Sequence, residues 1–458
     1  MQPTSHVDVH HRRVERVTVV GGGYVGLTTA VWLSATGSAV TLVEQDETKV
    51  ARLRAGRSPI FEQGVEELLQ AGLDAETLRV GQDLRLALPQ TDIVVVCVGT
   101  PSLTDGRADL GALNGVVATL RDEARDGTVM VIKSTVPPGT GVRAQRDFER
   151  AGRRIPVISC PEFLREGTAI EDLRTAARVV VGGEDAEAME RVAHLMTHGD
   201  PEVVLTDNTS AELIKYGSNA FLAVKISFIN EMANLCDLVG GDVDAVARGM
   251  GTDPRIGRSF LNAGLGFGGS CFPKDTRALE FTAGRNGYSF WMLKSAIEVN
   301  ERQRMRFVHR IRDAVGYQLE GRRVALLGLA FKPGTDDVRQ APAIDIALRL
   351  QELGAVVVAH DPVAIEMARG ELTGVELVDD PYQALAGADI AALVTEWPEY
   401  RALDWARIRE LMAGPVLVDG RNCLDAALLG DLGFNYHAIG RRPVVSHWSR
   451  RSVDRVVA

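Results

Sequence analysis

Short, unbroken apolar runs recur near both ends of this 458-residue chain and constrain its fold more than any other feature. In the first part of the chain they span 16–20, 39–43, 92–98, 129–134 and 178–181. Such continuous runs are typical of strands buried on both faces of a parallel sheet. Helix-forming segments, including 48–55 and 65–71, lie between them. The alternation of strands and helices predicts a doubly wound α/β domain.

The middle of the chain has a different pattern. From 207 to 240 no strand-like run occurs, and apolar residues recur at mixed three- and four-residue spacing, which predicts one long helix. Thr209 and Glu212 have the spacing of a capping box that would start it. Beyond Gly321 the strand and helix rhythm returns.

Strand-like runs in this last part span 323–327, 355–359, 389–394 and 416–418. The expected fold is therefore α/β, with two doubly wound Rossmann-like domains joined by a helical central domain that contains a long helix. We expect a disordered tail at 1–15, the three domains at 16–206, 207–315 and 316–445, and a second tail at 446–458.

Composition excludes several classes of protein. Lys and Arg number 51 against 61 Asp and Glu, and a net charge of −10 argues against a partner such as nucleic acid or an acidic membrane. No apolar run is long enough to span a membrane, and the first residues lack the apolar core of a signal peptide. The five cysteines form no Cys-x-x-Cys pair, so neither a disulfide framework nor a metal site is indicated. We expect a soluble cytoplasmic protein.

A glycine-rich turn follows the first strand-like run. Gly21, Gly23 and Gly26 have the spacing Gly-x-Gly-x-x-Gly, which lets a pyrophosphate approach the backbone at the N-terminus of the next helix. Glu44 ends the second strand-like run, where an acid accepts hydrogen bonds from a ribose 2′-hydroxyl and repels a 2′-phosphate. A turn without a ligand is the alternative, but the surrounding strand, helix and acid favour NAD binding.

A second glycine-rich segment, 264–269, leads directly to Cys271. The following residues suggest a helix, and a thiol at a helix N-terminus near Lys274 is expected to favour the nucleophilic thiolate. The ordinary interpretation of a free thiol is a buried, inert side chain, and we apply it to Cys97 and Cys236. It fits Cys271 poorly, because a glycine-rich loop is not a packed core.

Lys215 and Asn219 are four residues apart on the expected long helix and share one face. Each alone would be interpreted as ordinary surface. Together they could stabilise an oxyanion. Their spacing does not place them near Cys271.

Six motifs occur in order along the chain. They are Gly-Gly-Gly-Tyr-Val-Gly-Leu (21–27), Val-Gly-Thr-Pro (98–101), Lys-Ser-Thr-Val-Pro-Pro-Gly-Thr (133–140), Pro-Glu-Phe-Leu-Arg-Glu-Gly (161–167), Phe-Gly-Gly-Ser-Cys-Phe-Pro-Lys-Asp (267–275) and Phe-Lys-Pro-Gly-Thr-Asp-Asp (331–337). Together they resemble the UDP-glucose/GDP-mannose dehydrogenase family over nearly the whole chain.

The resemblance implies a four-electron oxidation of a nucleotide sugar at C6, with NAD as cofactor and a thioester intermediate. By matching position, Cys271 is the nucleophile that forms the thiohemiacetal and thioester, and Lys215 with Asn219 stabilises the oxyanion. Asp275 with Thr135 matches the groups that position a water, and Glu162 matches a general base for thioester hydrolysis.

The resemblance also implies two sets of binding residues. Those expected at the cofactor are Gly21, Gly23, Tyr24, Val25, Gly26, Glu44, Lys49, Thr100, Thr135, Glu166 and Arg339. Those expected at the substrate are Phe163, Leu164, Lys215, Asn219, Arg255, Phe260, Asn262, Gly264, Gly268, Phe331, Lys332 and Arg421. Arg255 matches an arginine that reaches a neighbouring subunit, so a homodimer or dimer-based oligomer is expected.

Several positions depart from the family's usual residues. Glu44 stands where aspartate is more usual, Cys160 replaces an asparagine before Pro161, and Phe267 replaces a tyrosine. None of these changes removes a group expected to act in catalysis.

Alternative interpretations remain open. Phe272 resembles the UDP-glucose branch of the family, but GDP-mannose or a UDP-N-acetylhexosamine is an alternative substrate. A two-electron β-hydroxyacid dehydrogenase would share the first domain but has no use for Cys271. An NAD-binding regulatory module without turnover is the alternative from a different class.

Overall fold

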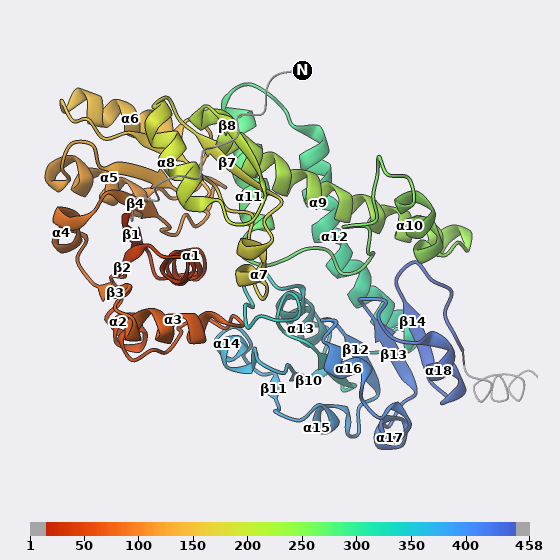
Figure 1. Cartoon of the computed structure of the whole chain (residues 1–458). Helices are drawn as coiled ribbons and strands as arrows, with labels where there is room; N and C mark the ends of the chain where they lie inside the picture. Colours follow the sequence, from red (N-terminus) through yellow and green to blue (C-terminus); the bar gives the residue numbers. More distant parts are fainter. Residues whose placement is uncertain (1–14, 446–458) are drawn as a thin grey trace, which may run out of the picture. The chain divides into compact units, whose positions relative to one another are not determined.

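The computed structural model describes residues 15–445 (Figure 1). Its contacts divide the chain into two compact units, of which unit 1 ends at Lys215 and unit 2 begins at Tyr216. The expectations for the tails, apart from Glu15, lie outside the described residues. Between residues 15 and 445, no helix is long and apolar enough to cross a membrane.

Unit 1 contains an eight-stranded sheet in the order β3-β2-β1-β4-β5-β6-β7-β8. Its strands are β1 Arg16–Val20, β2 Ala39–Val43, β3 Leu78–Gly81, β4 Ile93–Val96, β5 Val129–Ile132, β6 Val157–Ser159, β7 Arg178–Gly182 and β8 Glu202–Thr206. The order 3-2-1-4-5-6 is that of a Rossmann fold, which binds ligands at the carboxyl ends of the strands. The β6–β7 pairing is antiparallel, whereas the other neighbouring strands are parallel.

Helices cover both faces of this sheet, as Figure 1 shows. One apolar core joins the sheet to α1, α3 and α8, and a second joins its other face to α4, α5 and α6. The helices of unit 1 are α1 Tyr24–Ala35, α2 Glu47–Arg54, α3 Val65–Asp74, α4 Leu84–Ala87, α5 Gly111–Glu123, α6 Thr140–Arg150, α7 Ala169–Arg174 and α8 Ala186–Met196, with a 3₁₀ turn at Leu88–Gln90. Burial on both faces explains why β4 and β5 are apolar throughout.

Helix α9 (Asn208–Val239) begins in unit 1 and continues in unit 2. The capping box expected at Thr209 and Glu212 is wrong. Ser210 N donates to Asp207 Oδ1 (2.8 Å) at this helix start, and the Glu212 carboxylate bonds another helix instead. Glu212 accepts hydrogen bonds from the N–H groups of Gly139, Thr140 and Gly141 at the start of α6 (2.6–3.2 Å). Its carboxylate therefore anchors the first turn of α9 to α6.

The sheet of unit 2 repeats the same strand order with six parallel strands, β11-β10-β9-β12-β13-β14. The strands are β9 Arg323–Leu327, β10 Val356–His360, β11 Glu376–Leu377, β12 Ile390–Leu393, β13 Val416–Asp419 and β14 Asn435–Ala438. The two α/β parts of the chain are thus built alike, and the expected fold class is confirmed.

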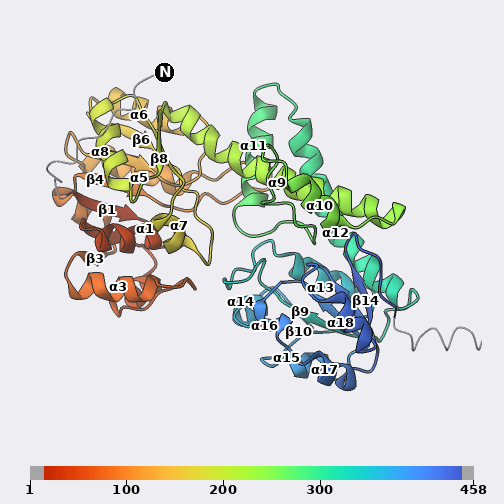
Figure 2. The ribbon, with the colours of Figure 1, turned by 45° about the vertical axis from the view of Figure 1, so that its right-hand side comes forward.

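Unit 2 also holds the helices that precede this sheet (Figure 2). Its helices after α9 are α10 Val243–Gly251, α11 Phe272–Arg285, α12 Trp291–Ala314, α13 Pro342–Glu352, α14 Ile365–Arg369, α15 Pro381–Leu385, α16 Pro398–Arg401, α17 Trp405–Leu411 and α18 Ala426–Asp431. The C-terminal parts of α9 and α12 share one apolar core with the sheet, while α11 packs on α9 and α12 through Tyr216, Leu279 and Leu293.

The anchor at Glu212 gives the first prediction. Glu212→Ala leaves three backbone donors and the Ser159 hydroxyl, all of which bond Glu212, without that acceptor. Each buried donor left unpaired costs about 1–3 kcal/mol, so we expect the free energy of unfolding to fall by about 3 kcal/mol or more. Urea unfolding measures this change.

The matched control is Glu231→Ala, which removes an exposed carboxylate from the same helix. We expect a change within about 0.5 kcal/mol, as is usual for exposed positions. Equal effects of the two substitutions would contradict an anchoring role for Glu212.

Candidate active site

The turn between β1 and α1 has the backbone required to bind a dinucleotide. Gly21 has a φ of +105°, and a Cβ there would lie 2.6 Å from the carbonyl oxygen of Cys97. A Cβ on Gly26 would lie 1.8 Å from the carbonyl oxygen of Gly21, so only glycine allows the helix to start this close to the strand. Nothing lies within 4 Å of the Cβ position of Gly23, which leaves the backbone there open to a ligand.

Glu44 lies beside this turn at the end of β2. Its Oε2 accepts a hydrogen bond from Gly22 N (2.8 Å), and its Oε1 accepts from Gln45 N (2.7 Å) and Asp46 N (3.0 Å). These donors hold the carboxylate where the fold binds a ribose 2′-hydroxyl. Lys49 lies in the first turn of the following α2. The residues present therefore fit an NAD molecule whose pyrophosphate lies at the start of α1.

The loops after β4 and β5 join at the same edge of the sheet. Thr100 Oγ1 donates to the carbonyl oxygen of Thr135 (2.8 Å), and Ser134 Oγ donates to that of Val98 (2.7 Å). Thr100 and Thr135, both expected from sequence, are thus brought together at the carboxyl ends of the strands.

The segment that carries Glu166 is held at the start of α1. Gly167 N donates to Tyr24 Oη (2.5 Å) and to Glu62 Oε2 (2.6 Å), and Ala169 N donates to Glu62 Oε1 (2.7 Å). Tyr24 and Glu166 were expected at the cofactor. Glu62 was not, because nothing in its neighbourhood in the sequence distinguishes it from a surface carboxylate.

Glu162 and Lys215 form a buried ion pair in unit 1. Lys215 Nζ lies 3.0 Å from Glu162 Oε1, and the two side chains are 4% and 6% exposed. Burial by itself would raise the pKa of the Glu162 carboxyl. The ammonium of Lys215, the N–H of Leu164 (2.6 Å) and the charge of Lys133 oppose it, so that the pKa lies below its ordinary value. Glu162 is therefore ionised at neutral pH and able to accept a proton.

Phe163 and Leu164 lie with Glu162 along a cavity of about 260 Å³ in unit 1. The guanidinium of Arg178 lies 4.0 Å from the centre of the Phe163 ring. Lys133 also lines this cavity, and sequence reasoning missed its role beside Glu162. The sequence did carry a signal for this role. Lys133 directly follows a buried parallel strand, and ligands bind at the carboxyl ends of such strands.

Cys271 in unit 2 is the N-cap residue of α11 and is partly exposed. Ser270 Oγ lies 3.6 Å from its sulfur. The other four thiols have a different environment. Burial raises the pKa of Cys97 and Cys423 to about 12, and it also raises the pKa of Cys160 and Cys236, which keeps these thiols protonated.

Asn219 and Asp275 meet beside the start of α11. Asn219 Nδ2 donates to Asp275 Oδ2 (2.7 Å), and Lys274 Nζ lies 2.6 Å from Asp275 Oδ1. Asp275 N donates to the carbonyl oxygen of Cys271 (2.8 Å), so the carboxylate and the thiol occupy the same helical turn. Asp275 is buried and its two oxygens are held by an amide and an ammonium.

The glycine-rich segment before Cys271 is packed against the C-terminal sheet domain. A Cβ on Gly268 would lie 2.5 Å from the carbonyl oxygen of Gln340, and one on Gly269 would lie 2.8 Å from the ring of Phe331. Arg421 donates through Nη1 to the carbonyl oxygen of Gly266 (3.4 Å) and through Nη2 to that of Phe331 (3.2 Å). The expected substrate residues Gly264, Gly268, Phe331 and Arg421 are thus brought together in unit 2.

Three buried amides hold the same segment from α9 and α12. Gly264 N donates to Asn230 Oδ1 (2.8 Å), and Gln303 Nε2 donates to the carbonyl oxygen of Gly264 (3.0 Å). Asn300 bonds both backbone groups of Phe267 (2.7 and 3.0 Å). Sequence reasoning missed these residues, since Asn and Gln at helical spacing are usually exposed.

The remaining expected residues of unit 2 lie around this segment. Phe260 has a φ of +63°, and its ring lies 6.3 Å from that of Phe272. Lys332 Nζ lies 5.4 Å from the Phe331 ring, and Arg339 pairs with Asp337 (2.7 Å). Asn262 is exposed.

Arg255 extends into solvent. It pairs with Asp253 (2.5 Å), and its side chain is 87% exposed. The expected contact with a neighbouring subunit stays a prediction.

Helix α9 carries one residue of the Lys215–Glu162 pair and one residue of the Asn219–Asp275 pair. Lys215 pairs with Glu162 in unit 1 and Asn219 pairs with Asp275 in unit 2, and the two residues are four positions apart on one continuous helix. Residues at this spacing share a helix face.

Comparisons with known proteins match three successive parts of the chain to one family. Residues 15–199, 209–302 and 325–426 match the NAD binding, central and UDP binding domains of the UDP-glucose/GDP-mannose dehydrogenase family. The first match confirms the expected cofactor NAD.

Two curated relatives align over nearly their whole length. The chain is 42% identical over 435 residues to the UDP-glucose 6-dehydrogenase TuaD of Bacillus subtilis (strain 168), with 94% of each chain covered. It is 43% identical over 444 residues to a UDP-glucose 6-dehydrogenase of Pseudomonas aeruginosa, covering 93% of this chain and 97% of that protein.

A solved structure is also similar. A UDP-glucose dehydrogenase from the archaeon Pyrobaculum islandicum superposes with a TM-score of 0.86 at 38% identity, covering 91% of this chain and 96% of that one. The family resemblance found in the sequence is thus confirmed.

The buried ion pair gives a prediction about pH. In Lys215→Met the ammonium is lost, so burial is expected to raise the pKa of Glu162 above its ordinary value. Ionising Glu162 then opposes folding, and the variant should lose stability as the pH rises from about 5 to about 7.5, by roughly 1.4 kcal/mol per unit of raised pKa. In the wild-type protein the lowered pKa of Glu162 stabilises the fold over this whole range.

Urea unfolding at both pH values measures the difference between wild type and variant. Adding Glu162→Gln to the variant removes the titrating group and should remove the extra pH dependence. A difference between wild type and Lys215→Met that does not change with pH would contradict the assignment.

Proposed function

Since the chain belongs to the UDP-glucose/GDP-mannose dehydrogenase family, we propose that it oxidises UDP-glucose at C6 to UDP-glucuronate in a four-electron reaction. The observation that carries the proposal is Cys271 at the N-terminus of α11, in the same helical turn as the buried Asp275, whose carboxylate accepts a hydrogen bond from Asn219 of α9. The relatives named UDP-glucose 6-dehydrogenase and the residue Phe272 favour UDP-glucose over GDP-mannose or a UDP-N-acetylhexosamine.

Cofactor binding falls to the first domain in this proposal. When bound, NAD+ would accept a hydride, and one NAD+ would be consumed in each of the two oxidation steps. Gly21 and Gly23 leave room for the pyrophosphate, while the Glu44 carboxylate accepts hydrogen bonds from the adenosine ribose. Tyr24, Val25, Gly26, Lys49, Thr100, Thr135, Glu166 and Arg339 complete the proposed cofactor set.

Cys271 provides covalent catalysis. After the first hydride leaves C6, the Cys271 sulfur adds to the aldehyde carbon and forms a thiohemiacetal. Loss of the second hydride leaves a thioester, and attack by water breaks the C–S bond, which releases the carboxylate and restores the thiolate. The N-terminus of α11 favours the thiolate form because helix dipoles stabilise a negative charge there.

Lys215 and Asn219 stabilise the oxygen anions formed at C6. An ammonium and an amide one helical turn apart can donate to the same oxygen. Because α9 is continuous between them, their spacing is set before the substrate binds. Preorganised donors of this kind stabilise developing charge without reorganising during the reaction.

Glu162 acts as the general base in thioester hydrolysis. Its lowered pKa keeps the carboxylate ionised, as a base must be before it accepts a proton. Asp275, together with Thr135, positions the attacking water. Asn219 and Lys274 donate to the two carboxylate oxygens of Asp275 and hold the carboxylate in one orientation, as positioning a water requires.

We propose two groups of residues for recognition of the nucleotide sugar. Arg421 and Lys332 are the cations for the diphosphate, in which role a guanidinium can make two parallel hydrogen bonds. Phe331 and the segment 260–268, including Asn262, surround the rest of the nucleotide, while Phe163 and Leu164 contact the sugar. These local cations explain how a chain of net charge −10 binds a dianion.

The three proposed domains thus have separate functions. They are NAD binding (16–206), catalysis and dimerisation (207–315) and UDP binding (316–445).

We infer that a second copy of the chain covers one face of α9. Phe221, Phe228 and Leu235 recur every seven residues and are 64%, 48% and 48% exposed. Seven residues are about two helical turns, so these side chains form one apolar stripe. Arg255, exposed and matched to an arginine that crosses between subunits in the family, would reach the substrate of that second copy.

Product stoichiometry tests the reaction. Purified protein given NAD+ and a limiting amount of UDP-glucose should form two NADH per sugar consumed, and GDP-mannose should give much slower turnover. Cys271→Ser should lower kcat by about a thousandfold or more, because the thioester step loses its nucleophile.

Cys236→Ala is the matched control, since this thiol is buried and is not among the residues proposed for catalysis or binding, and it should retain turnover. One NADH per sugar would indicate a simple two-electron dehydrogenase. No NADH with any sugar would indicate a regulatory module.

Sedimentation tests the pairing through α9. Phe228→Asp places a charge in the apolar stripe and should shift the protein from dimer or larger to monomer at micromolar concentration. Leu86→Asp changes an equally apolar side chain on α4, 82% exposed, and should leave sedimentation unchanged. A monomeric wild-type protein would contradict the proposed pairing.

A further inference from the structure

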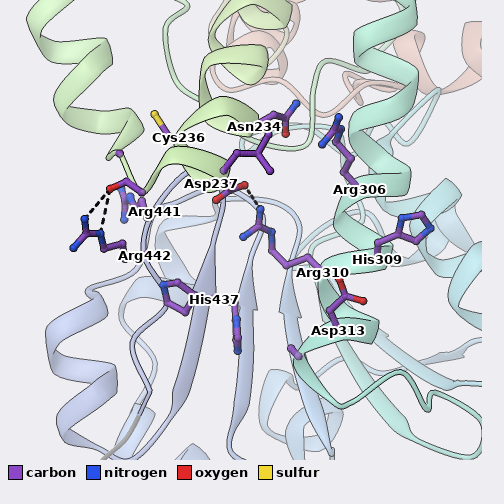
Figure 3. Close-up of a pocket in the computed structure, with 15 residues that line it drawn as sticks. Asn234, Cys236, Asp237, Arg306, His309, Arg310, Asp313, His437, Arg441 and Arg442 are labelled. Carbon is purple, nitrogen blue, oxygen red and sulfur yellow. Dashed lines mark hydrogen bonds and ion pairs between the residues drawn. The ribbon is translucent and has the colours of Figure 1, made fainter.

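A cavity of about 500 Å³ lies in unit 2, where the end of α9, the end of α12 and the segment after β14 meet (Figure 3). None of the residues proposed above for catalysis, cofactor or substrate lines it. Its volume lies in the range of pockets that hold small molecules. The cavity is therefore separate from the proposed active-site residues and large enough for a ligand.

Four arginines line this cavity, in a chain whose net charge is negative. Arg306 and Arg310 come from α12, and Arg441 and Arg442 come from the segment after β14, on the other side of the cavity in Figure 3. Cations gathered in a concave site reinforce one another and attract anions.

Within residues 15–445, carboxylates neutralise only two of these four guanidiniums. Arg310 pairs with Asp237, and Arg441 pairs with Asp244. Arg442 donates to the carbonyl oxygen of Gly240 (3.0 and 3.1 Å), which holds its guanidinium without removing its charge.

The side chain of Arg306 is exposed and has no hydrogen bond or ion pair to any of residues 15–445. The remaining lining carboxylate, Asp313, lies 3.6 Å from Arg312, which is not part of the cavity wall. Two positive charges, on Arg306 and Arg442, therefore remain without a carboxylate partner in the described part of the chain.

The other lining side chains limit the chemistry of a ligand. Two imidazoles, His309 and His437, can each donate a hydrogen bond. Among residues 15–445, no Phe, Tyr or Trp lines the cavity, so none of the described side chains there is suited to stack on a nucleobase. Recognition would depend on anionic groups and not on a base.

We propose that this cavity is a second anion site, which binds a small molecule carrying a diphosphate or two phosphate groups. Arg306 and Arg442 supply the two uncompensated charges from opposite walls, and Arg310 and Arg441 are held in place by their carboxylates for further hydrogen bonds. Guanidinium and phosphate match in geometry and form charge-assisted hydrogen bonds. The site does not depend on the oxidation proposed above.

Equilibrium dialysis of the full chain with labelled inorganic pyrophosphate at low salt tests the site. The proposed substrate site also recognises a diphosphate. The test is therefore the difference in pyrophosphate bound per chain between the wild type and a cavity variant, and not the total amount bound by either. The double variant Arg306→Gln/Arg442→Gln should bind one pyrophosphate fewer per chain than the wild type. Each guanidinium removed alone should weaken that site about tenfold or more.

Arg285→Gln/Arg369→Gln is the matched control, since it removes the same charge from exposed positions of unit 2 outside the cavity. It should bind as many pyrophosphates as the wild type. Equal binding by wild type and cavity variant would overturn the proposal, and so would an equal loss in both variants, because the effect would then reflect net charge alone.

Circular dichroism and the melting temperature show whether the variants fold. Arg306 is exposed and unpaired within the described residues, so Arg306→Gln alone should melt as the wild type does while losing affinity. An Arg306→Gln variant with intact fold and unchanged affinity would also overturn the proposal.

Discussion

The first turn of α9 is fixed by one buried carboxylate. Glu212 accepts three backbone N–H groups at the start of α6 and the hydroxyl of Ser159, while Asn208 bonds the backbone of β6 and β7. Lys215 is only three residues further along the same helix, so the anchor that positions α9 also positions the ammonium beside Glu162. Because the helix continues without a break, the position of Asn219 relative to Lys215 follows from helix geometry alone. The contact that anchors the start of α9 therefore also sets the position of the proposed oxyanion donor Lys215.

The glycine-rich segment before Cys271 is likewise held in place by hydrogen bonds from other parts of the chain. A segment with so much glycine has little conformational preference of its own, so its shape must come from its neighbours. Asn230, Asn300 and Gln303 bond its backbone from two helices, and Arg421 bonds it from the C-terminal domain. The absence of side chains at Gly268 and Gly269 is what allows Gln340 and Phe331 to approach. The same glycines that make the loop flexible in the unfolded chain make it tightly held in the folded one.

Much of the fold could be predicted because the central strands of a doubly wound sheet are apolar on both faces. The runs at 16–20 and 39–43 and the long helix were predicted at nearly their observed bounds. Strands β3, β6, β8, β11 and β14 were missed, since β6 and β11 have only three and two residues and β3, β8 and β14 are not buried throughout. The expected capping box failed for a physical reason, because Glu212 satisfies a distant helix and tertiary donors outweighed the local motif.

The residues of the candidate site also fall into those that the sequence predicts and those that it does not. Cys271, Glu44 and the glycines are recognisable because their chemistry depends on local chain geometry, which a sequence records directly. Lys133, Glu62 and the buried amides act through contacts between segments about 30 residues or more apart, and local sequence carries no trace of such contacts. The arginines of the second cavity belong to this group too, since Arg306 and Arg442 are separated by most of the C-terminal domain in sequence and line one cavity in space. Chemistry that a fold assembles from distant segments becomes visible only when the fold is known, and this explains why an acidic chain can hold a cationic site that its composition does not reveal.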